Sequence, residues 1–108
     1  MYYVYLLQSK KHSFSYVGCT RDLRKRFREH NAGIAQSTRA YAPFHLVYYE
    51  AYADVRDAAE RERQLKHSGP AVGHLKKRIR FSIPTNGGAP DFEHTQALAS
   101  TDDPRARM

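Results

Sequence analysis

Residues 2–30 read YYVYLLQSKKHSFSYVGCTRDLRKRFREH, and this stretch decides the fold of the chain. The aromatic and branched residues 2–7 predict a strand that is buried on both faces. A polar turn leads into residues 14–18, which predict a second strand paired with the first as a hairpin. Thr20 or Asp22 can cap the basic helix that follows. The N-terminal part of the chain is therefore expected to run strand, strand, helix.

The later segments extend this pattern. Residues 44–52, FHLVYYEAY, predict the longest strand, and their nearly continuous apolar character predicts a central position in the sheet. Asp54 can cap a second helix, which the Ser-Gly-Pro at 68–70 ends. Residues 71–80 predict a third, short, basic helix. The expected class is α/β of the α+β kind, a small, mainly antiparallel three-stranded sheet flanked by helices in the order β-β-α-β-α-α.

The chain of 108 residues has room for one small domain. We place this domain at residues 1–83. Residues 86–90, NGGAP, are a cluster of turn-forming residues, and the sequence after them shows no periodicity. Residues 84–108 are therefore predicted to form a flexible tail.

The charge of the chain predicts a polyanionic partner. The net charge is +7, and residues 1–80 carry 16 Lys and Arg against 7 Asp and Glu, whereas residues 81–108 carry 2 against 4. Nucleic acid is the first expectation for such a basic domain, and an anionic membrane surface is the second. A basic surface with no dedicated partner is the alternative interpretation.

The cysteine content and the lengths of the apolar runs indicate where the protein is located. The single cysteine, Cys19, excludes a disulfide within the chain, and no apolar run approaches the ~20 residues of a membrane span. No signal peptide is recognisable either. We therefore expect a cytoplasmic protein with no membrane association, while the sequence leaves the oligomeric state open.

Two residues of the first helix could contact a phosphate. Arg26 and His30 lie four residues apart, so they project from one face of the helix, about 100° from its buried stripe and hence at the border between core and solvent. A guanidinium offers a planar fork of donors that matches phosphate oxygens, and an imidazole can move a proton. A solvated basic helix face with an incidental histidine is the alternative.

Glu62 is unusual because it falls on the apolar face of the second helix, between Ala58 and Leu65. A carboxylate in that position either pairs with a cation or binds a metal ion. A single carboxylate completed by water is how Mg²⁺ is usually held at phosphate sites. The spacing alone leaves a metal ligand and a salt bridge to Arg26 or another arginine equally open.

Tyr5 and Tyr16 lie on the two strands that are expected to be neighbours, so both hydroxyls could point into one cleft. Most of the eight tyrosines must fill the core. A tyrosine acts as a general base only where a cation or a metal lowers its pKa from about 10. Taken alone, these two tyrosines are more simply core residues.

Taken together, these motifs resemble the GIY-YIG nuclease superfamily, in its small single-domain bacterial branch. The resemblance covers roughly residues 2–80. The order and spacing of the motifs together are more specific than any single motif. Its parts are Tyr3-Val4-Tyr5, Tyr16-Val17-Gly18, the helix with Leu23, Arg26 and His30, the strand from Pro43 to Glu50, and the segment at 61–66 that includes Glu62.

The resemblance implies a role for each of five residues. Tyr16 would be the general base that activates water, and Tyr5 would order that water or the phosphate. Arg26 would bind the scissile phosphate, with His30 assisting in proton relay or phosphate contact. Glu62 would anchor one divalent ion, Mg²⁺ or Mn²⁺.

The expected function is therefore a metal-dependent endonuclease that hydrolyses DNA phosphodiester bonds, with RNA as a possible second substrate. Structure or damage selectivity is expected rather than sequence specificity. The alternative is a nucleic-acid-binding module that has the nuclease fold but little or no catalytic activity. A purely structural or interaction protein is a more distant possibility.

Overall fold

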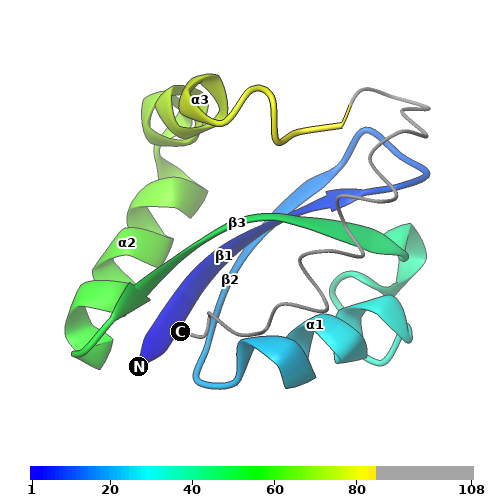
Figure 1. The fold of residues 1–108 in the computed structure, drawn as a ribbon, viewed down its shortest axis with the longest axis horizontal. Helices are drawn as coiled ribbons and strands as arrows, with labels where there is room; N and C mark the ends of the chain where they lie inside the picture. Colours follow the sequence, from blue (N-terminus) through cyan, green and yellow to red (C-terminus); the bar gives the residue numbers. More distant parts are fainter. Residues whose placement is uncertain (85–108) are drawn as a thin grey trace.

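The computed structural model describes residues 1–84 and has the predicted class and element order (Figure 1). A three-stranded antiparallel sheet is flanked by three α-helices, with one 3-10 helix in the connection before the last strand. The elements are β1 (Tyr2–Ser9), β2 (Ser15–Thr20), α1 (Leu23–Asn31), η1 (Arg39–Tyr41), β3 (Phe44–Tyr52), α2 (Val55–His67) and α3 (Gly69–Arg78). The tail predicted at 84–108 lies outside the described residues, apart from Pro84. Among residues 1–84, no helix combines the length and the apolar character needed to cross a membrane.

The prediction of a central position for residues 44–52 was wrong. The strand order is β2-β1-β3, so β1 is the central strand and β3 lies at one side of the sheet. The apolar run in β3 is buried because both faces of the sheet are covered: Phe44 and Leu46 belong to one core cluster, whereas Val47 belongs to the other. Continuous burial of side chains therefore does not require a strand on each side.

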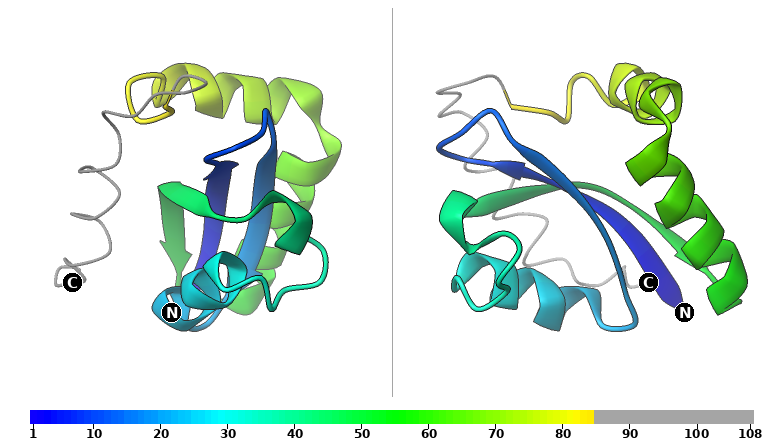
Figure 2. Two further views of the ribbon diagram at one scale, coloured as in Figure 1. Left: turned by 90° about the vertical axis from the view of Figure 1, so that its right-hand side faces the viewer. Right: turned by 180° about the vertical axis from the view of Figure 1, so that it is seen from behind.

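The sheet separates two hydrophobic clusters, and Figure 2 shows α1 on one side of it with α2 and α3 on the other. Side chains alternate between the two faces along β1, which is buried on both faces as predicted. The first cluster packs against α2 and α3 and contains Val4, Leu6, Val17, Val47, Ala58, Leu65 and Leu75. The second cluster packs against α1 and contains Tyr5, Leu7, Phe44 and Leu46, with Leu23 and Phe27 from the helix.

Side-chain caps fix where the helices begin. Asp22 accepts a hydrogen bond from the backbone N–H of Lys25 at 3.1 Å, so this residue caps α1. Asp54 caps α2 as predicted. After α1, Gly33 has a φ of +76°, the left-handed conformation that favours glycine. The Asn31 side chain then accepts from the backbone N–H of Phe44 at 2.7 Å, which joins the end of α1 to the start of β3.

A polar cluster joins β3 to α2 on the face opposite α1. Glu50 accepts hydrogen bonds from the Tyr48 hydroxyl at 2.7 Å, from the Tyr52 hydroxyl, and from Arg61 Nε at 3.0 Å. Burial alone would raise the pKa of Glu50, yet these hydrogen bonds hold it below its usual value. Only 15% of the Glu50 side chain and 24% of the Arg61 side chain are exposed, so this pair is better shielded from water than a surface pair.

We expect the variant Arg61→Met to lower the free energy of unfolding by about 2 kcal/mol, because it leaves the shielded Glu50 carboxylate without its cation. Thermal or urea unfolding would measure this loss. Arg56→Met is the matched control, since Arg56 pairs with Asp54 at 2.8 Å on the exposed surface of the same helix. Equal effects of the two variants would contradict a special role for the Glu50–Arg61 pair.

Candidate active site

The two motif tyrosines lie on the same face of the sheet. In the antiparallel register of β1 and β2, Tyr5 is opposite Gly18 and Leu7 is opposite Tyr16. Opposite residues share a face, so Tyr5 and Tyr16 are diagonal neighbours on the side covered by α1. Their ring centroids are 6.4 Å apart. The two rings therefore lie side by side on one face of the sheet, and the expectation that both hydroxyls enter one cleft stays a prediction.

Gly18 makes room for the Tyr5 ring. A Cβ atom built on this glycine would lie 2.4 Å from the Tyr5 hydroxyl oxygen, 2.5 Å from its Cζ and 2.9 Å from Tyr16 Cε2. Real Cβ atoms do not approach other atoms this closely. A glycine inside a strand often marks such a close approach. Gly18, the last residue of the Tyr-Val-Gly motif, is thus needed for the packing of Tyr5 and Tyr16.

His30 lies deep inside the protein, which corrects the expectation that it would sit at the border of core and solvent. The residue has no exposed surface. Its Nε2 is 2.9 Å from the Tyr5 hydroxyl oxygen, and its Nδ1 is 2.7 Å from Thr38 Oγ1. The connection between α1 and β3 folds back over the end of α1 and, with Phe44, closes over the imidazole. Helix geometry alone could not predict this cover.

Burial keeps both members of the Tyr5–His30 pair neutral. Desolvation lowers the pKa of His30 to about 4, and the nearby positive charge of Arg26 acts in the same direction. Desolvation also raises the pKa of Tyr5 to about 12, with a further contribution from Tyr16 and an opposing one from Arg26. Neither group changes its charge near neutral pH, so Tyr5 is poorly suited to act as a base.

Arg26 occupies the predicted border position. Its side chain is 37% exposed and donates to Glu29 Oε1 at 2.9 Å. This hydrogen bond is the main cause that raises the pKa of Arg26, and an interaction with the Tyr5 hydroxyl adds to it. The guanidinium therefore pairs with Glu29, lies close enough to the Tyr5 hydroxyl to interact with it, and remains partly open to a ligand.

Glu62 reaches the same region from the opposite face of the sheet. Its side chain is 28% exposed and forms an ion pair of 3.1 Å with Lys66, so the expected alternative of an arginine partner was wrong. The Glu62 charge contributes to the raised pKa values of Tyr5 and Cys19, which places the carboxylate near both. An unpredicted residue, Lys66, has its Nζ 5.4 Å from the centre of the Tyr16 ring.

These contacts meet at the outer edge of β2, the side of Ser15–Thr20 that has no neighbouring strand within residues 1–84. Tyr16 faces α1, whereas Lys66 comes from α2 on the other face, so the lysine must reach around this edge. The β2 edge thus brings together side chains from β1, β2, α1 and α2. Sequence spacing could not show this, because it depends on β2 being an outer strand.

The donor set around Glu62 fits a loosely held divalent ion. Within residues 1–84 no cluster of three His, Cys, Asp or Glu side chains is placed to hold a metal. A single carboxylate is nevertheless a sufficient protein ligand for Mg²⁺, which keeps several waters and takes its other oxygens from a phosphate. Any such ion would have to compete with the Lys66 ammonium for the carboxylate.

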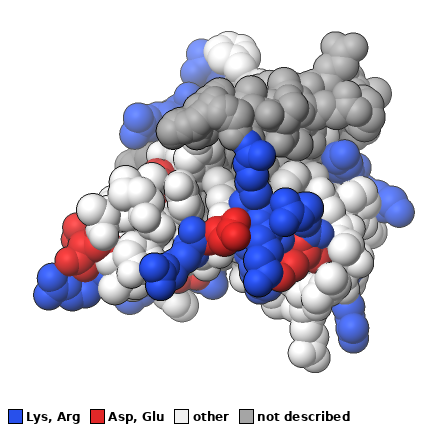
Figure 3. Space-filling view, turned by 60° about the horizontal axis from the view of Figure 1, so that its bottom comes forward, with Lys and Arg blue, Asp and Glu red and all other residues white. Residues whose placement is uncertain are grey.

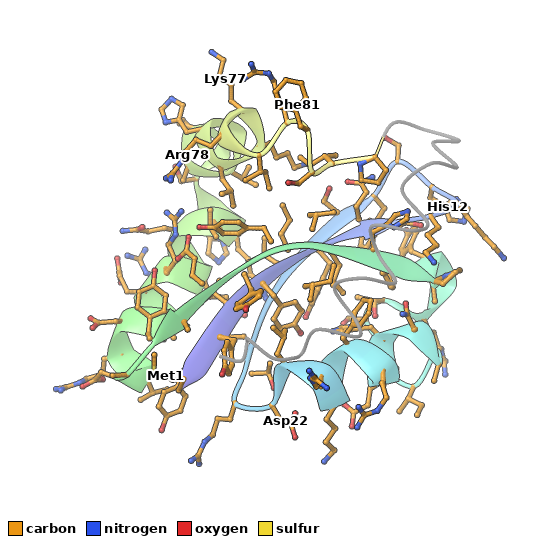
Figure 4. The ribbon with its side chains drawn as sticks, in the orientation of Figure 1. Met1, His12, Asp22, Lys77, Arg78 and Phe81 are labelled. Carbon is orange, nitrogen blue, oxygen red and sulfur yellow. The ribbon has the colours of Figure 1, made fainter. Side chains whose placement is uncertain are left out.

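Exposed Lys and Arg side chains lie on two helices, α1 and α3. Figure 3 views the molecule from the side of α1, where Lys and Arg side chains are gathered among a few acidic ones. Lys25 and Arg28 are exposed there. Figure 4 shows Lys77 and Arg78 pointing outward from α3, at the far end of the molecule from Asp22. The basic character predicted from the composition therefore covers two separate helices.

Because His30 is neutral in the folded protein, we expect stability to depend on pH. The unfolded chain binds a proton at this histidine near pH 6.5, whereas the folded protein binds it only near pH 4. Stability should therefore fall as the pH drops from about 6.5 to 4, by on the order of 2 kcal/mol. Thermal unfolding across this range would measure the slope, which should be strongly reduced in His30→Gln and persist in the control His67→Gln; the slope that remains comes from carboxylates such as Glu50, whose pKa is held below its usual value. A slope unchanged in His30→Gln would contradict this assignment.

Comparison with known proteins identifies a family that this chain resembles. A family model described as "GIY-YIG catalytic domain" matches residues 1–71. A UPF0213 protein of Halalkalibacterium halodurans is 33% identical over 101 residues, covering 93% of this chain and 98% of that protein. A UPF0213 protein of Clostridium perfringens is 43% identical over 67 residues, covering 61% and 71% respectively. No solved structure matches the chain.

These matches cover the strands and helices that supply Tyr5, Tyr16, Arg26, His30 and Glu62. The family implies nuclease activity on DNA and hence a nucleic acid substrate, in agreement with the resemblance found in the sequence. The chain belongs to the GIY-YIG catalytic domain family.

Proposed function

We propose that this protein is a metal-dependent endonuclease that hydrolyses DNA phosphodiester bonds and selects DNA by its structure or damage rather than by its sequence. The observation that supports this most strongly is the convergence at the β2 edge. There the Tyr16 ring lies 6.4 Å from the ring of Tyr5, and the charges of Arg26 and Glu62 act on the hydroxyl of the neutral, buried Tyr5–His30 pair.

The environments of the two tyrosines give them different roles. Tyr5 is buried and has a pKa of about 12, so it holds its proton and positions Arg26. Tyr16 is only half-buried and has the Lys66 ammonium above its ring, so it is the better candidate to take a proton from an attacking water. Tyr16 is accordingly the proposed general base.

The cations of the site would act on the phosphate. Arg26 presents a guanidinium whose orientation is fixed before the substrate arrives, and such a group stabilises negative charge as it develops on the phosphate oxygens. Glu62 would hold Mg²⁺ or Mn²⁺, and the bound ion would supply Lewis acidity. His30 has both ring nitrogens engaged, so it would support Tyr5 rather than contact the phosphate.

Selection by structure or damage is favoured by the nature of the basic surfaces. The exposed charged side chains on α1 and α3 are those of Lys and Arg, which contact phosphates. Phosphate contacts position a protein on DNA but carry no direct sequence information. A substrate would therefore be chosen by where its backbone can bend into the β2 edge. RNA offers the same phosphates and is the open alternative substrate.

One observation favours the second candidate, a binding module with little or no activity. The Glu62 carboxylate is already paired with Lys66 at 3.1 Å, and a divalent ion must replace this contact. A protein in which the ion pair persisted would bind nucleic acid without cutting it. The two functions differ in whether a divalent ion changes the DNA.

A cleavage screen tests the proposal. Supercoiled plasmid, branched DNA, single-stranded DNA and RNA would each be incubated with Mg²⁺, Mn²⁺ or EDTA. We expect nicking or cleavage only with a divalent ion, its loss in Tyr16→Phe, and its retention in the control Tyr2→Phe, whose ring packs against the cluster on the opposite face of the sheet. If no substrate is cut with either ion, the endonuclease proposal fails. If binding shows no salt dependence, the nucleic-acid proposal fails as well, because phosphate contacts release counterions.

A further inference from the structure

A chain of hydrogen-bonding side chains runs beneath the candidate site and ends in a loop. Thr38 and His30 have no exposed surface, and only 2% of Tyr5 is exposed. The contacts are 2.7 Å between Thr38 Oγ1 and His30 Nδ1, and 2.9 Å between His30 Nε2 and the Tyr5 hydroxyl oxygen. Thr38 lies in none of the motifs that carry the resemblance, and it comes from the connection between α1 and β3.

The neutral imidazole allows two arrangements of protons along this chain. In the first, His30 Nδ1–H donates to Thr38 and the Tyr5 hydroxyl donates to Nε2. In the second, the Thr38 hydroxyl donates to Nδ1 and Nε2–H donates to Tyr5. A neutral histidine has one donor and one acceptor nitrogen, so no mixed arrangement satisfies both contacts.

Two considerations favour the first arrangement. A phenol is a stronger acid than an aliphatic alcohol and is therefore the better donor to an imidazole nitrogen. Arg26 also interacts with the Tyr5 hydroxyl, and a guanidinium can only donate. In the first arrangement Tyr5 donates to His30 and keeps a lone pair for Arg26. Each arrangement leaves one buried hydroxyl hydrogen outside the chain, that of Thr38 in the first and that of Tyr5 in the second, but only the second sets this hydrogen on the oxygen that Arg26 approaches.

We propose that Thr38 is a positioning residue of the site, which acts through His30 and Tyr5 on the guanidinium of Arg26. The Thr38 hydroxyl accepts the Nδ1 proton and so fixes the tautomer of His30. In that tautomer Nε2 accepts a hydrogen bond from the Tyr5 hydroxyl, whose hydrogen therefore points toward His30. A lone pair of the hydroxyl oxygen then remains to accept a hydrogen bond from Arg26. This role in catalysis rests on the proposed nuclease function, whereas the tautomer itself does not.

The variant Thr38→Val tests the proposal, because valine has the shape of threonine but cannot accept a hydrogen bond. The probe is the tautomer of His30, read from ¹⁵N chemical shifts in long-range ¹H–¹⁵N spectra of the metal-free protein. We expect the Nδ1–H form in the wild type and in Thr38→Ser, which keeps the hydroxyl. We expect the Nε2–H form in Thr38→Val, since an Nδ1–H group facing a methyl would be buried without an acceptor.

Cleavage kinetics give the second measurement. If the protein cuts DNA, Thr38→Val should lower kcat by about tenfold with little change in KM, and Thr38→Ser should restore it, as is typical when a supporting hydrogen bond is lost. Ser37→Ala, at the exposed neighbouring position, is the control and should change neither readout.

The possible outcomes separate this inference from the proposed function. An Nε2–H tautomer in the wild type, or an Nδ1–H tautomer retained in Thr38→Val, would overturn the positioning role whether or not the protein is a nuclease. If both tautomers are as expected and the wild type cuts DNA, an unchanged kcat in Thr38→Val would overturn the link to Arg26. Failure of the wild type to cut any substrate would overturn the proposed function and the catalytic part of this role, but not the tautomer assignment.

Discussion

Glu62→Gln is expected to abolish divalent-ion-dependent cleavage, with a loss on the order of 10²- to 10³-fold or more in the single-turnover rate. Glutamine preserves the size of the side chain but removes the negative charge that attracts the ion. Binding of Mn²⁺, measured by titration in the absence of DNA, should be lost in parallel. Affinity for DNA without a divalent ion should stay the same or rise slightly, because a negative charge near the phosphates has been removed.

Glu60→Gln is the matched control for this experiment. Glu60 lies on the same helix, two residues away, but it is exposed and pairs with Arg63 at 2.5 Å. We expect this variant to behave like the wild type in cleavage, in Mn²⁺ binding and in DNA binding. If Glu62→Gln cleaves DNA normally, or if Glu60→Gln loses as much activity as Glu62→Gln, the proposed metal ligand is not Glu62.

Gly18→Ala is expected to destabilise the protein by about 3 kcal/mol, which corresponds to a fall in Tm of about 10 °C or more for a domain of this size. The added methyl would meet the Tyr5 ring at 2.4–2.5 Å. That ring cannot move away easily, because it is buried and its hydroxyl contacts His30. Any Tyr5 displacement would also disturb Arg26, so activity should fall even at temperatures where the variant remains folded.

The control for this substitution is Gly73→Ala, a second glycine in regular structure. Gly73 is in α3, and among residues 1–84 no atom beyond its chain neighbours and the backbone of its own helix lies within 4 Å of a Cβ built there. Alanine is favoured over glycine inside a helix by roughly 0.5–1 kcal/mol, so this variant should be slightly more stable than the wild type. A Gly18→Ala protein as stable as Gly73→Ala would show that the Tyr5 ring has more freedom than the contacts indicate.

The sequence predicted the elements well because their signals are local. A continuous run of aromatic and branched residues marks β1, and capping residues such as Asp22 and Asp54 mark the helix starts. The order of the strands in the sheet was harder to predict from the sequence. The apolar run of β3 resembles that of a central strand, and only the covering of both faces by helices explains why an outer strand is buried in this way.

The candidate site was only partly predictable for the same reason. Spacing placed Arg26 and His30 on one face of α1, but it could not show that the following connection buries His30 and leaves Arg26 at the surface. Thr38 carried no sequence signal, since a threonine in a polar loop is ordinary. Lys66 lies four residues after Glu62, and that spacing could have indicated their ion pair.

The division of the interior by the sheet has an evolutionary consequence. The cluster around Val4, Ala58 and Leu75 packs on the far side of the sheet from His30, with no side chain shared between the two clusters. Substitutions that repack this cluster can change the melting temperature while leaving the surroundings of Tyr5 intact, because separated sites have nearly additive effects. A lineage could therefore adapt to heat or cold through one half of the domain while preserving the other half for function.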